Sequence, residues 1–563
     1  MPLYEKYVGR SRDDFATLED LNKNYSITVG EDFNFAYDVI DLLGIQNPDK
    51  LAMLWVGENN EERRITFGEL MELTNKTANF FKELGVVKGD KVMLVLKRGY
   101  QFWYALLALH KIGAVAIPAT HLLTPKDFVY RCNSAGVKMI VITGDNQVAE
   151  TADEALPECP TVTLKAVTKH EKAVDGWVDF DAGVDAASPV WTRPAGEADT
   201  KSTDRAIIFF SSGTTGYPKM VSHDHTYPLG HILTGCFWHR VEDDGLHFTV
   251  SDTGWGKALW GKIYGQWLGG SAVFIYDFEK FNPVDILSKI EKYKVTTFCA
   301  PPTMYRYMIK EDLKSFDFSA LRHCTTAGEA LNPEVYAQWK NQTGLKIFEG
   351  FGQTETTLCC LTVYPWMQPR LGSMGVPAPG YRMVICDENG NEVGAGVTGE
   401  ICIRTDDEGG GKPFGLFSGY YRDEEQTRQS WHDGLYHTGD TAYKDEMGFL
   451  WYVGRVDDVI KSSGYRIGPF EVESALMEHK AVLEAAVTGI PDEDRGFIVK
   501  ATIVLVKGYE GCDALTKELQ EHVKKVTAPY KYPRVIEYVD ALPKTISGKI
   551  RRVEIREKDG IKK

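Results

Sequence analysis

The sequence predicts an α/β protein. We expect a large N-terminal domain of two doubly wound α/β subdomains plus an antiparallel β subdomain, followed by a small α+β C-terminal domain. Between residues 66 and 142, and again between 207 and 327, mostly apolar runs alternate with helical patterns, as in parallel sheets covered by helices. After about residue 372, short strands are separated by Gly, Asn and Asp turns, which favours antiparallel pairing.

The first α/β stretch begins with a helix whose two ends can be predicted. Thr66 followed by Glu69 forms a capping-box pattern, and apolar residues from Leu70 to Leu84 recur at helical spacing. Gly85 is expected to end the helix. The next run, KVMLVL at 91–96, is mostly apolar, as expected of a buried parallel strand.

The later elements follow in order. The second alternation holds strands AIIFF at 206–210, AVFIY at 272–276 and TTFCAP at 296–301. The antiparallel region holds MVICD at 383–387, GEICIR at 399–404 and FLWYVG at 449–454. In the C-terminal part we expect a helix from about Phe470, a strand over 499–506 and an amphipathic helix over 515–525.

Composition limits the class of protein. With 563 residues, 43% hydrophobic and 25% charged, the chain resembles a soluble globular protein of several domains. Its net charge of −15 argues against a nucleic-acid partner or an anionic membrane surface. No run of eighteen apolar residues is long enough for a transmembrane helix.

The first twenty residues and the cysteines predict a cytoplasmic location. The N-terminal stretch has no apolar h-region and is not poor in acidic residues, unlike a secretory signal or a transit peptide. The ten cysteines form no CxxC pair and the histidines form no HExxH. We therefore expect reduced thiols and no structural metal site.

The segment Phe209–Met220, FFSSGTTGYPKM, is the most informative motif. Its glycines permit close backbone approach, and successive N–H groups can form an anion nest. Its hydroxyls and lysine can contact phosphate; the residues concerned are Ser211, Ser212, Gly213, Thr214, Thr215, Gly216 and Lys219. It is not a Walker A loop, and composition alone leaves a solvated polar loop open. GAGVTG at 394–399 matches GxGxxG but precedes a β-rich run, so we expect a hairpin turn.

Several motifs in order resemble the AMP-forming acyl-CoA synthetases of the adenylate-forming superfamily. They are SSGTTGYPK at 211–219, AGEAL at 327–331, EGFGQTET at 349–356, HTGD at 437–440, GRVDDVIKSSGYRI at 454–467 and KTISGKIRR at 544–552. The resemblance covers about residues 66 to 552. SDTGW at 251–255 and CAPPT at 299–303 indicate the medium-chain branch.

The resemblance implies an ATP-dependent ligase that adenylates a carboxylic acid and transfers the acyl group to CoA, with Mg²⁺ as metal. Lys549 would stabilise charge at the α-phosphate, Glu355 would bind Mg²⁺, and Thr354 would donate to the α-phosphate. Other implied nucleotide contacts are Gly328, Glu329 and Ala330 on one adenine face, Phe351 on the other, Asp440 and Arg455 at the ribose, Arg466 near the phosphates, and Glu349, Gly350 and Gln353 beside them.

The resemblance also implies a conformational step. The large domain would comprise residues 1–456 and the small mobile domain 458–563, with Asp457 as the hinge between them. Ser463 and Gly464 would line the tunnel for the pantetheine arm of CoA.

The implied acyl pocket differs from that of acetate-specific relatives. Gly352 replaces a tryptophan, and Gly256 and Ala327 replace valines, so we expect room for a medium-chain or branched acid. Candidate apolar walls are Trp238, Trp255, Trp260 and Cys299. Lys257 either caps the pocket or points away, because a buried lysine needs a partner.

Three alternatives stay open. An aromatic acid such as benzoate also fits a wide pocket. A carrier protein could replace CoA as the acyl acceptor. A nucleotide-binding protein without turnover is disfavoured by the combination of Lys549, Glu355 and Asp440. The oligomeric state is open, a homodimer included.

Overall fold

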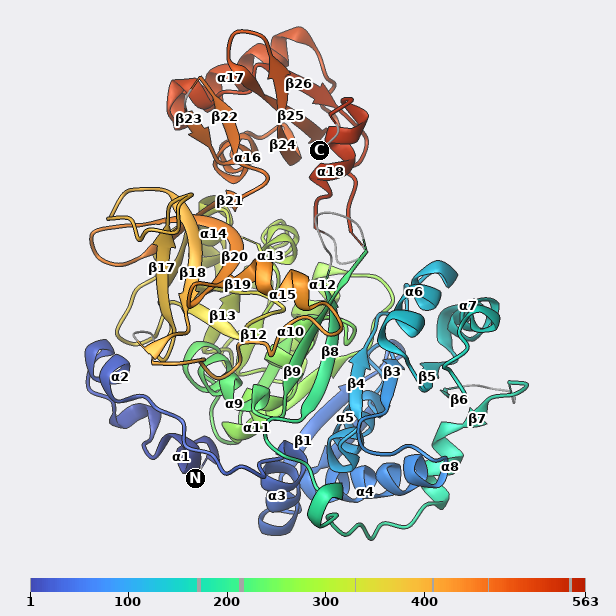
Figure 1. Cartoon of the computed structure of the whole chain (residues 1–563). Helices are drawn as coiled ribbons and strands as arrows, with labels where there is room; N and C mark the ends of the chain where they lie inside the picture. Colours follow the sequence, from blue (N-terminus) through green and yellow to red (C-terminus); the bar gives the residue numbers. More distant parts are fainter. Residues whose placement is uncertain are drawn as a thin grey trace.

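The computed structural model describes residues 2–169, 174–211, 217–329, 331–407, 410–463, 465–545 and 549–561. A large body carries a small lobe formed by the last hundred residues (Figure 1). The expected α/β class and the division into a large body and a small α+β lobe agree with this arrangement. None of the described helices is long and apolar enough to cross a membrane.

The first sheet has the order β7-β6-β5-β3-β4-β8-β9. The strands β3, β4, β5, β6, β7 and β8 are parallel, and β9 is antiparallel to β8. Their bounds are β3 Lys91–Val95, β4 Val115–Pro118, β5 Met139–Thr143, β6 Leu164–Thr168, β7 Val178–Asp179, β8 Arg205–Ser211 and β9 Lys219–Asp224. The helices of this part are α4 Phe67–Glu83, α5 Gln101–Ile112, α6 Pro125–Ala135, α7 Val148–Ala155 and α8 Phe180–Ala186.

The second sheet runs without a break from parallel to antiparallel pairing, in the order β17-β18-β20-β21-β16-β15-β14-β13-β12-β10-β11-β1-β2, with β19 beside β20. The parallel part comprises β1 Leu51–Val56, β10 Leu246–Thr249, β11 Ala272–Tyr276, β12 Thr297–Cys299, β13 His323–Thr326 and β14 Ile347–Gly352, edged by the antiparallel β2 Glu62–Thr66. The antiparallel part comprises β15 Leu358–Leu361, β16 Ser373–Pro377, β17 Arg382–Cys386, β18 Gly399–Arg404, β19 Trp431–His432, β20 Leu435–Lys444 and β21 Leu450–Arg455.

The helices around this sheet complete the large body. They are α9 Tyr227–Ile232, α10 Gly256–Gly261, α11 Tyr264–Leu268, α12 Pro283–Lys292, α13 Pro302–Met308, α14 Pro333–Thr343 and α15 Glu424–Ser430, with α1 Tyr4–Val8, α2 Leu18–Asn24 and α3 Leu42–Gln46 at the N-terminus. Residues 394–398 lie between the antiparallel strands β17 and β18, and Gly399 begins β18, as expected of a hairpin connection.

The two sheets exchange segments in a way that the sequence order does not predict. Strand β8 was expected in the second alternation, but Ile207 pairs with Ala116 of β4 in the first sheet. Strand β1 precedes the first sheet in sequence, yet Met53 pairs with Val273 of β11 in the second. Sheet membership follows from long-range pairing, which hydrophobic periodicity does not encode.

Helix α4 begins and ends as predicted, but the side chain of Glu69 has a different partner from the one that the capping-box pattern predicts. The Thr66 hydroxyl accepts the Glu69 N–H at 3.2 Å, so Thr66 is the N-cap. Gly85 follows the helix with φ of 94°, which favours glycine. The Glu69 carboxylate accepts from Arg63 at 3.1 Å.

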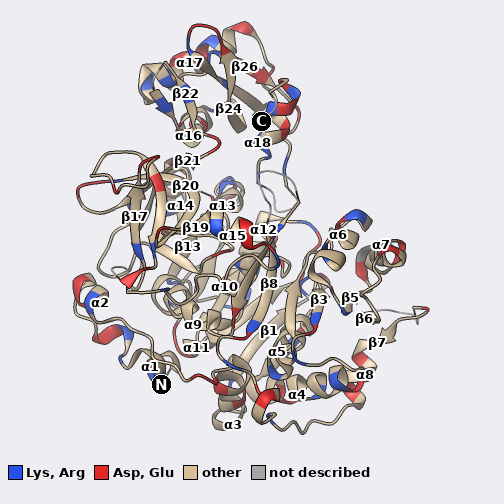
Figure 2. Cartoon of the chain, in the orientation of Figure 1, with Lys and Arg blue, Asp and Glu red and all other residues tan. Residues whose placement is uncertain are grey.

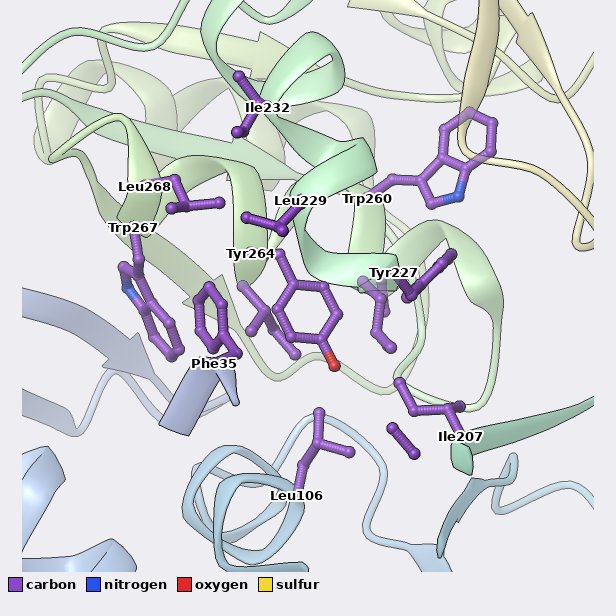
Figure 3. Close-up of a cluster of buried hydrophobic side chains, with 14 of the residues drawn as sticks. Phe35, Leu106, Ile207, Tyr227, Leu229, Ile232, Trp260, Tyr264, Trp267 and Leu268 are labelled. Atoms are coloured by element: carbon purple, nitrogen blue, oxygen red, sulfur yellow. The ribbon is translucent and has the colours of Figure 1, made fainter. Parts of the chain in front are cut away.

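An aromatic core joins the two sheets (Figure 3). Tyr264, Tyr227, Trp267 and Phe35 are fully or almost fully buried there, with Ile207 from β8 beside them. The Tyr264 hydroxyl is 2.9 Å from Nε2 of the buried His110. This core fixes β8, which leads into the phosphate-loop motif, against the second sheet.

The C-terminal lobe is built as predicted around its own core. Helix α16 spans Pro469–Met477, β25 spans Gly496–Leu505 and α17 spans Asp513–Val526, close to the expected elements. The remaining elements are β22 Ile460–Ser462, β23 Tyr465–Ile467, β24 Val482–Asp492, β26 Val535–Tyr538 and α18 Arg552–Lys558. Leu519 and Val523 of α17 pack with Val472 and Ala501. Figure 2 shows basic residues on the face of the lobe that carries β22.

Candidate active site

The candidate ribose contacts meet on β20 and β21. Asp440 is buried, and its carboxylate lies 3.3 Å from the Arg455 guanidinium and accepts from the Tyr452 hydroxyl at 3.3 Å. Gln353 donates to the other oxygen. Burial raises the pKa of Asp440, while the Arg455 charge opposes that rise. Three predicted residues from three motifs therefore form one hydrogen-bonded group.

A glycine turn aims Asp440 at this group. Gly439 has φ of 70°, and an added Cβ would lie 2.6 Å from an Arg455 nitrogen. The pairing between β18 and β20 also shifts register at this point, which is a β-bulge of the kind that redirects side chains. The positive φ favours glycine at this turn, in agreement with the HTGD pattern.

Glu355 lies beside the phosphate-loop motif. Its carboxylate accepts from the Tyr420 hydroxyl at 3.0 Å. The Lys219 ammonium lies 5.0 Å from the centre of the Tyr420 ring. Burial lowers the pKa of Lys219, and the charge of Glu355 acts in the opposite direction. Thr354 precedes Glu355, and its backbone carbonyl oxygen lies 2.8 Å from Nε2 of the His223 ring.

The phosphate-loop motif joins β8 to β9, and Ser211 pairs with Lys219 at its base. Ser212, Gly213, Thr214, Thr215 and Gly216 lie outside the described residues. Tyr217 stacks on Tyr130 of α6 at 4.4 Å between ring centres, and the Tyr130 hydroxyl donates to the Pro218 carbonyl at 2.9 Å. The motif therefore starts and ends on positioned residues.

The adenine-side segment is held by Glu349. Its carboxyl accepts the Leu331 N–H at 3.0 Å, and burial raises its pKa to about 8. Glu329 accepts from the Thr303 hydroxyl at 2.9 Å, and Gly328 has φ of 105°. Ala330 lies outside the described residues. Glu349 was expected to contact the nucleotide; its carboxyl instead binds the backbone of the segment that would do so.

Gly350, Phe351 and Gly352 end strand β14 beside this segment. Phe351 is half-buried, as a ring available for stacking must be. An added Cβ at Gly350 would lie within 3 Å of both Leu358 and Trp238. Close packing requires glycine there.

Lys549 enters the site from the C-terminal lobe. Its backbone pairs with Thr545, and the flanking Lys544 bridges to Ile550. The Lys549 charge acts on the carboxylate of Asp440 and lowers its pKa, after the larger effects of burial, Arg455 and Gln353. The Lys549 ammonium therefore lies close enough to Asp440 to act on its carboxylate electrostatically.

The hinge candidate Asp457 lies where the two lobes join, and the tunnel candidate Ser463 contacts a residue of the C-terminal lobe. Asp457 is 3.9 Å from the Arg455 guanidinium, and the next residue, Asp458, pairs with Arg556 of α18 at 2.6 Å. The Ser463 hydroxyl accepts from Arg495 at 3.3 Å. Gly464 lies outside the described residues.

Arg466 is placed differently from the expected phosphate contact. It forms an ion pair with Glu388, in the segment after β17, and Lys461 binds the same carboxylate at 3.1 Å. This cluster ties the lobe to the antiparallel part of the large domain. The register pairs Lys461 with Arg466 across β22 and β23, which directs both cations to one place.

The acyl-pocket candidates surround α10, but the space beside Gly352 is filled. An added Cβ at Gly352 would lie 2.4 Å from the Trp260 ring and 2.4 Å from the Thr357 carbonyl oxygen. Trp260 therefore occupies the volume that the glycine leaves, and Gly352 alone does not enlarge the pocket as expected. Beside Gly256, by contrast, an added Cβ meets no atom within 4 Å.

Lys257 is anchored to the backbone at Ala327. Its ammonium donates to the Ala327 carbonyl at 2.8 Å, and burial lowers its pKa. The other wall candidates are the buried Trp238, whose indole donates to the Glu349 carbonyl at 3.2 Å, the buried Cys299 on β12 and the half-buried Trp255. The predicted pocket residues are thus neighbours, and the Trp260 ring fills the space beside Gly352.

Tyr420, Tyr452 and Glu400 were missed by the sequence reasoning. Each touches a predicted residue: Tyr420 touches Glu355, Tyr452 touches Asp440, and Glu400 touches Gly439 at 2.8 Å. A lone tyrosine or glutamate on a strand or in a loop carries no pattern of its own. Its role becomes visible only when the strands are paired.

This two-lobed site, with acidic and hydroxyl groups on one lobe and a lysine supplied by the other, defines an enzyme that activates its substrate with a nucleotide. The chain belongs to the AMP-binding enzyme family: the model for the AMP-binding enzyme matches residues 45–421, and that for its C-terminal domain matches residues 471–549.

Its relatives narrow the class to acyl-CoA ligases. The chain is 41% identical to the Mus musculus protein named acyl-coenzyme A synthetase ACSM3, mitochondrial, over 99% of this chain and 96% of that protein. It is also 41% identical to the Homo sapiens acyl-coenzyme A synthetase ACSM5, mitochondrial, over 94% and 91%. The chain is an AMP-forming acyl-CoA ligase that uses ATP and CoA, as the resemblance implied.

Solved structures agree. An anthranilate CoA ligase in complex with anthranoyl-AMP superimposes with a TM-score of 0.85 at 28% identity, covering 94% of this chain and 98% of that one. An acyl-CoA synthetase from Brucella canis gives 0.73 at 31% identity, covering 97% and 99%. The predicted fold class is therefore confirmed.

The predicted cytoplasmic location is contradicted by these relatives, whose names place them in mitochondria. That prediction depended on the composition of the first twenty residues and on the cysteine pattern. Targeting information is confined to a short segment and leaves no mark on the folded domains, so the rest of the sequence could not correct it.

Proposed function

We propose that this ligase activates a medium-chain or branched carboxylic acid as its acyl-adenylate and then transfers the acyl group to CoA. The group formed by Asp440, Arg455, Gln353 and Tyr452, with Lys549 close to it, is the observation that carries the proposal. A buried carboxylate can accept from both ribose hydroxyls, and the guanidinium fixes its orientation.

In the first half-reaction the acid attacks the α-phosphorus of ATP, and pyrophosphate leaves. Negative charge builds on the α-phosphate oxygens and the leaving group, so the site needs positioned cations rather than a base. Lys549 supplies one cation from the lobe, and Lys219 supplies another at the base of the phosphate-loop motif. Thr354 and the hydroxyls of 211–215 would donate to the phosphates.

Glu355 would hold Mg²⁺. Carboxylate and phosphate oxygens are the ligands that Mg²⁺ prefers, and Glu355 lies between the phosphate-loop motif and Tyr420. The donor set therefore fits this metal. The cation would neutralise charge on the leaving group.

The second half-reaction requires Lys549 to leave so that the thiol can approach. We infer that the lobe, residues 458–563, turns about Asp457 relative to residues 1–456. Among the described residues, the ion pairs that join the lobe to the large domain beyond Asp457 are those of Glu388 with Arg466 and Lys461, and these are exposed and therefore weak. Ser463 and Gly464 would then face the pantetheine arm.

The acid would lie between Gly256, Ala327 and Trp260. Open space beside Gly256 gives width, while the indole of Trp260 limits depth. This shape suits a branched or medium-length chain better than a long straight one. An aromatic acid is the second candidate, because a neighbour of the same fold is named as an anthranilate ligase.

One screen tests the proposal. Acids of two to twelve carbons, branched acids and benzoates are each incubated with ATP and Mg²⁺, with and without CoA, and pyrophosphate, AMP and thioester are measured. We expect the highest kcat/KM for a medium or branched acid, with thioester formed only when CoA is present. The proposal would be refuted if ADP and phosphate were released, or if AMP and pyrophosphate formed in the presence of CoA without any thioester.

A further inference from the structure

Three metal-ligand side chains gather on β18 and β20, outside the residues assigned to the ligase chemistry. Cys402 lies directly opposite His437 in the antiparallel register. Glu400 is two residues before Cys402, so both side chains point to the same face of the sheet. The carboxylate, thiol and imidazole donor atoms all lie within 4.8 Å of one another.

The spacing of these atoms is close to that of a zinc site. His437 Nδ1 is 3.0 Å from the Glu400 carboxylate and 3.5 Å from Cys402 Sγ. Tetrahedral zinc, with bonds of about 2.0–2.3 Å, separates its ligand atoms by about 3.3–3.7 Å. Small side-chain adjustments would therefore suffice. A set of sulfur, nitrogen and oxygen donors suits Zn²⁺, whereas Mg²⁺ and Ca²⁺ prefer oxygen alone.

Neighbouring groups hold the three side chains of this cluster in place. Cys402 is fully buried, and the His437 ring stacks on His432 with centres 4.2 Å apart. The second oxygen of Glu400 accepts the Gly439 N–H at 2.8 Å. Glu400 is therefore held from both sides, as a metal-binding carboxylate commonly is.

The same contact connects the cluster to the nucleotide site. Gly439 belongs to the bulged turn that aims Asp440 at Arg455. Zinc binding would draw Glu400 and His437 apart from their present 3.0 Å and so shift the two ends of this turn. A displacement of the turn would weaken the fit of Asp440 to the ribose.

We propose that Glu400, Cys402 and His437 bind one Zn²⁺ ion and that the bound ion inhibits the ligase by distorting the turn that carries Asp440. Binding forms a zinc–sulfur bond and releases the thiol proton to solvent. The inhibitory part rests on the proposed role of Asp440; the binding part does not.

Metal binding is measured first, without ATP, by titrating zinc into the full-length protein against a chromophoric chelator. We expect one zinc ion per chain, and an affinity at least about tenfold weaker in Cys402→Ala and in Glu400→Gln. Glu400→Gln keeps an acceptor for Gly439, so it guards against misfolding. Cys512→Ser, which removes the exposed cysteine, is the matched control and should bind zinc as the wild type does.

Inhibition is measured second, as the KM for ATP with and without one equivalent of zinc. We expect zinc to raise this KM in the wild type and in Cys512→Ser but not in Cys402→Ala. Zinc binding that survives Cys402→Ala and Glu400→Gln, or is lost in Cys512→Ser, overturns the site. Equal inhibition of wild type and Cys402→Ala overturns the coupling, and absent ligase activity with intact binding would count against the proposed function alone.

Discussion

Shortening Trp260 should let the ligase accept longer acids. The side chain is 7% exposed on α10, and its ring would lie 2.4 Å from a Cβ added at Gly352. It fills the volume that the glycine leaves open. Trp260→Leu keeps an apolar side chain there and removes most of the indole, so the change opens the pocket in depth without placing a polar group in the core.

The size of the effect follows from the volume gained. Replacing the indole by a branched butyl group frees room for about three methylenes, each contributing about 0.8 kcal/mol when buried. The gain in transition-state binding for a longer acid is therefore about 2.4 kcal/mol, or about 60-fold in kcat/KM. Loss of the buried ring also costs stability, of the order of 2 kcal/mol or more.

Pyrophosphate release with straight-chain acids of four to twelve carbons measures the shift. The optimum should move up by about three carbons in Trp260→Leu. Trp339→Leu is the matched control, because Trp339 is fully buried in a different core and should lose stability without changing selectivity. An unchanged chain-length profile in Trp260→Leu, or the same shift in both variants, would remove Trp260 from the pocket.

Three further outcomes are expected. Lys549→Ala should lose adenylation activity by about 10²–10³-fold yet still form thioester from supplied acyl-adenylate. The control Lys558→Ala, which loses only a pair with Glu537, should keep both steps. Equal loss of both steps in Lys549→Ala would contradict this division. Glu355→Gln should raise the Mg²⁺ concentration for half-maximal activity at least about tenfold, while an unchanged Mg²⁺ titration would exclude Glu355 as the ligand. Glu349, with its pKa raised by burial from 4.5 to about 8, should stabilise the fold fully below its unfolded pKa and lose that contribution as pH rises through the folded value. Urea unfolding between pH 4.5 and 8 should therefore show that the free energy of unfolding of the wild type falls by up to about 1.4 kcal/mol per pH unit relative to that of Glu349→Gln. A difference that does not depend on pH would count against a buried neutral carboxyl.

Local structure was predictable from the sequence because its causes are local. The cap at Thr66, the end at Gly85 and the strand at 91–95 each depend on a few neighbouring residues. The exchange of β1 and β8 between the two sheets was not predictable, because both strands read as buried apolar runs in either sheet.

The candidate site shows the same division. Motif order places Gln353, Asp440 and Arg455 in one family pattern, and the structure brings them within contact of one another. The partner of Arg466 could not be predicted, since Glu388 is distant in sequence and carries no motif. Gly352 and Trp260 were both expected at the pocket, but the sequence did not show that the Trp260 ring fills the space beside the glycine. Whether a glycine leaves a space or another residue fills it is decided by packing.

The connections among these parts indicate why one site could serve two half-reactions. The adenine-side segment follows β13, and the ribose group lies on β20 and β21, and these strands belong to one unbroken sheet. The phosphate-loop motif comes from the first sheet. The aromatic core joins that sheet to the second sheet through Ile207 and Tyr264. Lys549 alone belongs to a separate lobe, on a segment closed at its base by the bridge between Lys544 and Ile550. Turning that lobe would withdraw the cation while leaving the nucleotide contacts proposed for the large domain in place, so the adenylate could stay bound as the thiol arrives.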